Sequence, residues 1–132
     1  IKEDDNSVPY FYNDYWYITK YEKGKDYPIY TRKHIQLDAE EEIILDVNLL
    51  AKDYKYFRVS GISVSPDNKK VSYGVDTLSR RIYTIKIKNL DTDEMYSDNI
   101  EGVNSYAAWA EDSETIFYTG KDTQTFSLSE EF

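Results

Sequence analysis

The stretch VSGISVSPDNKKVSYGVD, residues Val59–Asp76, decides the fold class of this chain. Apolar residues alternate with small or polar ones on both sides of its centre, and this period of two is typical of β-strands. Between the two runs, Pro66 presets φ, and the side chains of Asp67 and Asn68 can bond the local backbone. The stretch therefore predicts a β-hairpin that turns at Ser65–Asn68.

The alternation continues downstream. A third strand is predicted over Ile82–Lys88, with Tyr83, Ile85 and Ile87 on one face. A polar turn at Leu90–Glu94 follows, and Met95 begins a short fourth strand. Together these segments predict a unit of four short antiparallel strands.

The N-terminal part gives similar signals. It predicts, in order, a hairpin over Tyr10–Tyr21 that turns at Asn13-Asp14, a turn over Glu22–Asp26, a strand over Pro28–Arg32, an acidic turn over Asp38–Glu42 and a short strand over Ile43–Leu45. Asp46 can cap a short helix over Val47–Lys52, with Leu49 and Leu50 turned to a core.

Two internal repeats support a β-propeller. At an offset of 53, Ile29–Lys33 matches Ile82–Lys86 without a gap, and Leu37-Asp38 matches Leu90-Asp91. A second repeat, at an offset of 45, matches the following pairs of segments: Val64–Asp67 with Trp109–Asp112, and Val71–Tyr73 with Ile116–Tyr118. A four-strand unit that returns at this spacing has the period of a propeller blade. The alternative is an ordinary β-meander with chance identities.

We therefore predict an all-β chain of antiparallel four-stranded blades, divided into a lead-in at 1–9, a first blade at 10–58 with a short helix near 47–52, a second blade at 59–102 and the start of a third at 103–132. A propeller closes with at least about four blades, so about two and a half blades make an incomplete one. The chain begins at Ile1 rather than Met and ends at Glu130–Phe132 just after a strand, which favours a piece of a longer protein.

Composition excludes several functional classes. The 132 residues contain no Cys and one His, which argues against a disulfide framework, a zinc finger and a multi-histidine metal site. The net charge of −9 disfavours nucleic-acid binding, and no apolar run approaches the roughly 20 residues that span a bilayer. The 14 Tyr fit a chain rich in strands.

Candidate catalytic residues are weak. Gly61-Ile62-Ser63 approaches the G-x-S-x-G nucleophile elbow, but Ser65 occupies the closing glycine position and Ser63 lies inside a predicted strand. His34 follows a strand beside basic residues, and no partner nucleophile can be argued for it. We interpret both as structural and predict no catalytic residue in this chain.

Candidate binding residues are weak as well. The acidic runs Asp38–Glu42 and Asp91–Glu94 lack the spacing of a calcium loop, so we interpret them as solvated turns. Lys20, Lys23 and Lys25 lie among tyrosines, but the negative net charge opposes a nucleic-acid stacking platform. We expect no metal site and no cofactor, and interpret the chain as a scaffold or gate.

The ordered series of motifs resembles the opening of the propeller in the oligopeptidase B branch of the prolyl oligopeptidase family. The resemblance runs from about Ser7 to Asp122 and is carried by the segments Ser7–Tyr10, Tyr27–Lys33, Ile44–Ala51, Val64–Asn68, Tyr73–Thr77, Trp109–Asp112 and Ile116–Thr119. The prolyl oligopeptidase branch proper is the runner-up.

That resemblance implies a seven-bladed propeller that caps an α/β-hydrolase domain of the same protein, lets only short peptides reach a Ser-Asp-His triad, and belongs to a cytoplasmic enzyme that cleaves after Lys or Arg. The triad of the family lies downstream, so no catalytic residue carries over to this segment. The alternatives are a non-enzymatic propeller that binds proteins, although the Gly-His and Trp-Asp dipeptides of such repeats do not occur here, and a small independent β-domain. Open strand edges lead us to expect self-association of the chain alone.

Overall fold

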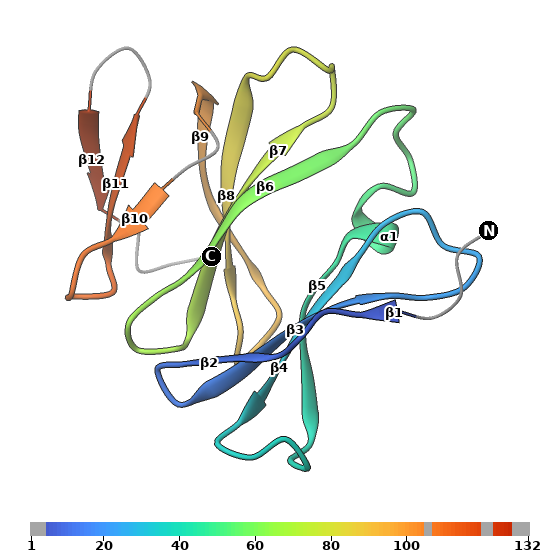
Figure 1. Ribbon diagram of the computed structural model, residues 1–132. Coiled ribbons are helices and arrows are strands. Elements are labelled where there is room, and N and C mark those ends of the chain that lie inside the picture. The colour runs from blue at the N-terminus through green and yellow to red at the C-terminus, as the bar shows by residue number, and fades with distance from the viewer. Residues whose placement is uncertain (1–4, 105–106, 120–122, 128–132) are drawn as a thin grey trace. The chain divides into compact units, whose positions relative to one another are not determined.

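The computed structural model describes residues 5–104, 107–119 and 123–127, which form antiparallel sheets and one short helix (Figure 1). The chain divides into two compact units, residues 1–53 and 54–132. The elements are β1 (Asp5–Asn6), β2 (Tyr10–Tyr12), β3 (Tyr15–Tyr21), β4 (Ile29–His34), β5 (Glu41–Asp46), α1 (Val47–Leu50), β6 (Arg58–Val64), β7 (Lys70–Asp76), β8 (Tyr83–Asn89), β9 (Met95–Val103), β10 (Ala107–Trp109), β11 (Thr115–Thr119) and β12 (Thr123–Ser127).

The first unit contains one sheet, in which β1 and β2 both pair with β3 and are followed by β4 and β5. Strand β1 pairs with the end of β3 at Tyr21, and β2 pairs with its beginning, so the two short strands share one edge position. The predicted hairpin is confirmed, because Asn13 and Asp14 form the turn between β2 and β3 with φ of 48° and 73°. Positive φ at both central residues suits the twist of a two-residue hairpin. The predicted lead-in therefore already contributes a strand.

The acidic turn predicted over Asp38–Glu42 is partly wrong. Glu41 and Glu42 belong to β5, where Glu41 lies opposite Lys33 and Glu42 lies opposite Arg32. Glu42 forms an ion pair with Arg32, and Glu41 forms one with Lys20 of β3. Opposite charges on neighbouring strands of a sheet stabilise strand pairing. The solvated-turn interpretation therefore fails for these two residues.

The helix α1 is shorter than predicted. The Asp46 carboxylate caps it by accepting a hydrogen bond from the Asn48 amide at 3.0 Å, as expected for an N-cap. Val47 and Ala51 are buried, whereas Leu49 is 71% exposed, so the prediction for Leu49 is wrong. Residues four apart lie on the same face of a helix. Val47 and Ala51 therefore share the buried face, and Leu49 lies on another face.

The second unit contains the four-stranded sheet β6-β7-β8-β9 and the three-stranded sheet β10-β11-β12 (Figure 1). The four predicted strands are confirmed, although β9 extends over nine residues to Val103 and is not short. The repeat at an offset of 45 is confirmed in the backbone. In the β6–β7 turn the Ser65 amide donates to the Lys70 carbonyl, and in the β10–β11 turn the Ala110 amide donates to the Thr115 carbonyl, both at 2.8 Å.

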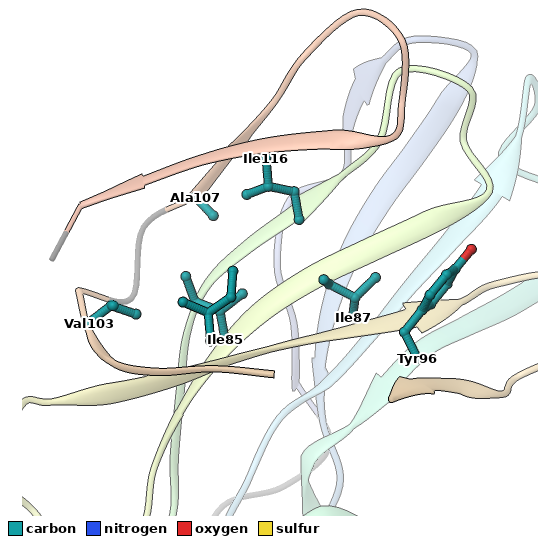
Figure 2. Close-up of a cluster of buried hydrophobic side chains, with 7 residues drawn as sticks. Ile85, Ile87, Tyr96, Val103, Ala107 and Ile116 are labelled. Atoms are coloured by element: carbon teal, nitrogen blue, oxygen red, sulfur yellow. The ribbon is translucent and has the colours of Figure 1, made fainter. Parts of the chain in front are cut away.

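A hydrophobic core joins these two sheets. Its buried members are Ile85, Ile87, Tyr96, Ile100, Val103, Ala107 and Ile116. Figure 2 shows Ile116 and Ala107 facing the side chains of Ile85 and Val103. Strand β7 is buried on both faces, because all of its residues from Val71 to Asp76 are buried. Burial of a central strand on both faces is what stacked propeller blades require.

The all-β antiparallel fold class is confirmed. The blade boundaries at 10–58, 59–102 and 103–132 stay a prediction. The first residues of the lead-in, 1–4, and the end of the chain at Glu130–Phe132 lie outside the described residues.

Candidate functional site

Ser63, the only approach to a nucleophile elbow, lies within strand β6. Its backbone carbonyl accepts hydrogen bonds from the Trp109 indole at 3.0 Å and from the Ser72 hydroxyl at 3.4 Å. The neighbouring Gly61 has a φ of 67°, at a point where the register of β6 against β7 shifts. That conformation favours glycine and marks a β-bulge, which accounts for Gly61 without catalysis.

His34 ends strand β4, where its side chain is exposed. Its ring packs against Tyr15, with the ring centroids 4.9 Å apart. The neighbour of this imidazole is thus an aromatic ring on the next strand, and the interpretation as a surface histidine is supported.

The candidate ligand residues form local ion pairs. Lys20 pairs with Glu41 at 3.0 Å, Lys25 with Glu22 at 2.9 Å, and Lys88 with Asp93 at 3.2 Å. Among the described residues, no group of three or more His, Cys, Asp or Glu side chains could hold a metal ion. No helix among these residues is long and apolar enough to cross a membrane.

A buried arginine lies on the first sheet. Arg32 is 2% exposed, and its Nη2 and Nε donate to Glu42 Oε1 at 2.7 and 2.8 Å. The guanidinium carbon lies 4.0 Å from the centre of the Tyr15 ring, a cation–π distance. Burial raises the pKa of the Tyr17 hydroxyl, although a hydrogen bond with Arg32 acts in the opposite direction. These contacts hold Arg32 in place within the sheet.

Sequence reasoning missed this cluster, but the repeat contained a signal. At an offset of 53, Arg32 falls on Ile85, which is fully buried in the second unit. A charged residue at the repeat position of a buried isoleucine needs charged and aromatic partners, and Glu42 and Tyr15 supply them.

The β7–β8 hairpin encloses a second feature, built around the buried carboxylate of Asp76. Its oxygens accept hydrogen bonds from the backbone amides of Leu78 and Arg81, both at 2.9 Å, and more weakly from Arg80. Burial alone would raise the pKa of Asp76, but these amide hydrogen bonds outweigh it and lower the pKa. The carboxylate therefore organises a loop in which Ser79 and Arg81 have positive φ.

A shallow hollow of about 200 Å³ lies beside this hairpin. Leu78, Ile82, Arg80 and Glu101 contribute to its lining. Leu78 and Ile82 are 67% and 57% exposed. The arrangement offers apolar and charged contacts, which suits binding rather than bond-breaking chemistry.

Strand β2 consists of three consecutive aromatic residues, all of them exposed. Tyr10, Phe11 and Tyr12 are 62%, 48% and 68% exposed. The Tyr10 ring stacks on Tyr17 at 5.4 Å, and the Phe11 ring packs on Trp16 at 5.1 Å. These cross-strand pairs hold the exposed rings in defined positions.

Comparison with known proteins places these features in a family. Residues 1–130 match the prolyl oligopeptidase N-terminal beta-propeller domain. The chain belongs to the prolyl oligopeptidase family. Among curated relatives, dipeptidyl aminopeptidase BI of Pseudoxanthomonas mexicana is 37% identical over 95% of the chain, and protease 2 of Moraxella lacunata is 33% identical over 92%.

Solved structures of this family have the same fold. Oligopeptidase B from Leishmania major superposes with a TM-score of 0.90 at 31% identity over 99% of the chain. Oligopeptidase B from Trypanosoma brucei, solved with covalently bound antipain, gives 0.85 at 28% identity over 98%. The chain spans only about a fifth of these proteins: 19% of the length of each curated relative, 20% of the Leishmania major structure and 19% of the Trypanosoma brucei structure. The predicted family and the predicted propeller fold are thus confirmed.

Proposed function

We propose that this chain is the N-terminal propeller segment of a serine oligopeptidase that hydrolyses short peptides after Lys or Arg. The observation that carries the proposal is the match of residues 1–130 to the propeller domain of peptidases, together with coverage of about a fifth of each relative. A C-terminal α/β-hydrolase domain of the same protein is the proposed partner and supplies the triad. By family resemblance, the proposal includes a cytoplasmic location.

The role proposed for this segment is exclusion. A strand buried on both faces, such as β7, belongs to a densely packed layer that a folded protein does not penetrate. Flexible peptides pass such a layer through a channel or a cleft, so the layer selects substrates by size. The segment itself is proposed to be inert, because its serine candidate Ser63 is held within a strand.

The test is an assay of the whole parent protein and of the 132-residue chain, side by side. Short peptides that present Arg, Lys or Pro at the cleaved bond are offered to both proteins. We expect the parent to cleave after Arg and Lys and the chain alone to cleave none of them. Cleavage by the pure chain, or a parent without peptidase activity, would refute the proposal; cleavage after Pro alone would refute its substrate class.

A further inference from the structure

Met95, the one methionine in the sequence, begins strand β9 and is 40% exposed. Its Sδ atom accepts a hydrogen bond from the Tyr73 hydroxyl of β7 at 3.6 Å. Strand β8 lies between these two strands, where Lys86 is opposite Tyr73 and Lys88 is opposite Met95 (Figure 1). Because residues two apart on a strand share a face, both side chains lie on the face of the sheet that is turned away from the hydrophobic core of this unit.

The donor in this contact is better suited to a stronger acceptor than the sulfur. Tyr73 is 2% exposed, and burial raises the pKa of its hydroxyl to about 12, so the phenol keeps its proton at physiological pH. A buried hydroxyl needs a hydrogen-bond partner, and a thioether sulfur is a weak acceptor. The Tyr73 hydroxyl is thus held beside an atom that would satisfy it better once that atom carried an oxygen.

The chemistry that adds this oxygen needs an oxidant alone. In the reaction with hydrogen peroxide, a sulfur lone pair of Met95 attacks one peroxide oxygen, the O–O bond breaks, an S–O bond forms and water leaves. The sulfur is oxidised by two electrons, which the peroxide takes up. Exposure of the side chain gives a small oxidant access, and the flexible Met side chain can turn the new oxygen toward Tyr73.

We infer that Met95 is a reversible oxidation site at which the Tyr73 hydroxyl donates a hydrogen bond to the sulfoxide oxygen. Oxidation of methionine ordinarily disrupts packing, because a flexible apolar side chain becomes polar. At Met95 the new oxygen meets a donor that is already in place, so the sheet keeps its structure. A methionine sulfoxide reductase reverses the step with a dithiol, which becomes a disulfide while the oxygen leaves as water. The inference goes beyond the proposed function, since it needs neither a triad nor a substrate.

The test treats the whole parent protein with hydrogen peroxide. Trypsin cuts after Lys88 and Lys121, so a single peptide carries Met95 as its one methionine, and mass spectrometry reads its oxidation. We expect Met95 to gain one oxygen in the native protein and to lose it again on treatment with methionine sulfoxide reductases and dithiothreitol. A Met95 that stays unoxidised in peroxide that oxidises free N-acetylmethionine would refute the oxidation site.

Hydrogen exchange of the β8 and β9 amides then measures the role of Tyr73. Oxidation should leave the exchange rates of the wild type unchanged, whereas oxidised Tyr73→Phe should exchange about fivefold faster, the equivalent of one hydrogen bond. Unoxidised Tyr73→Phe should exchange like the wild type, because the bond that it lacks is to a weak acceptor. Met95→Leu is the matched control, since peroxide should leave its exchange unchanged with either residue at position 73.

Met95→Gln gives a second measurement that needs no peroxide, because its side-chain carbonyl places an acceptor oxygen near the position of the sulfoxide oxygen. This variant should exchange like the wild type, and adding Tyr73→Phe should raise the rates about fivefold. Faster exchange in Met95→Gln alone, or equal acceleration in oxidised wild type and oxidised Tyr73→Phe, would refute the role of Tyr73. All of these readouts are local to β8 and β9, so a parent protein without peptidase activity refutes the proposed function and leaves this test intact.

Discussion

Replacing Glu42 by Gln tests whether the buried arginine is held by its carboxylate. The Arg32 side chain is 2% exposed, and two of its nitrogens bind the same Glu42 oxygen at 2.7 and 2.8 Å. Removing one partner of a fully buried ion pair costs about 3–5 kcal/mol, whereas an exposed pair contributes about 0.2–1 kcal/mol. Because the Glu42 side chain is 40% exposed, solvent screens part of the interaction. We therefore expect Glu42→Gln to lower the free energy of unfolding by about 2 kcal/mol.

Arg32→Met in the Glu42→Gln background removes the uncompensated charge and fills most of the space. This double variant should lie within about 1 kcal/mol of the starting protein, because apolar replacements of buried ion pairs are often nearly neutral. The measurement is urea unfolding followed by the fluorescence of Trp16, in a Trp109→Phe background so that the first unit alone reports. The ion pair does not hold the sheet as described if the effects of the two substitutions on the free energy of unfolding are additive, or if Glu42→Gln changes that free energy by less than about 0.5 kcal/mol.

Four further outcomes are expected. Asp76→Ala removes the acceptor of the hairpin amides, so trypsin should cut after Arg81 severalfold faster, as read by mass spectrometry of the products; unchanged cleavage would mean that the carboxylate does not order the loop. Trp109→Phe should cost about 1 kcal/mol in urea unfolding, the usual value of one hydrogen bond, and a loss near zero would show that the link between β6 and β10 carries no energy. Burial opposes ionisation of Glu41, but hydrogen bonds from Lys20 and Thr31 and the charge of Lys20 lower its pKa below the usual 4.5. This group therefore contributes stability above its usual pKa that is lost as the pH falls through the folded value, and Glu41→Gln should flatten the acid limb of stability against pH. The chain alone should self-associate in sedimentation and Phe11→Lys should reduce this, because charge blunts an exposed edge; a strictly monomeric chain would contradict it.

Local chemistry made much of the fold predictable from the sequence. The Asn13-Asp14 turn and the Ser65–Asn68 turn were predictable because few residues adopt these backbone conformations, and Asn68 indeed has a φ of 64°. The repeat at an offset of 45 predicted that the β6–β7 and β10–β11 turns are equivalent. The same turn residues between two alternating runs of apolar residues favour the same hairpin. The family followed from the order of many weak motifs rather than from any one of them.

What sequence reasoning missed depends on partners distant in the chain. Glu41 and Glu42 resembled a turn because their run is acidic, and only the register of β4 against β5 shows that they face Lys33 and Arg32. Leu49 looked like a core residue because it is apolar, but which face of a one-turn helix is buried is set by tertiary packing. The sequence does not predict that Tyr10, Phe11 and Tyr12 of β2 are exposed, because three consecutive aromatic residues do not show which faces of a strand are covered.

The hydrogen bond from Trp109 to the Ser63 carbonyl has a consequence for how such sheets multiply in evolution. The acceptor is backbone, so this hydrogen bond makes no demand on the side chain at residue 63 and depends on the indole donor of the following sheet. A duplicated blade can therefore keep the bond while the acceptor position changes its side chain. The buried residues of the shared core, such as Ile85 and Ile116, remain under constraint, because they pack against one another.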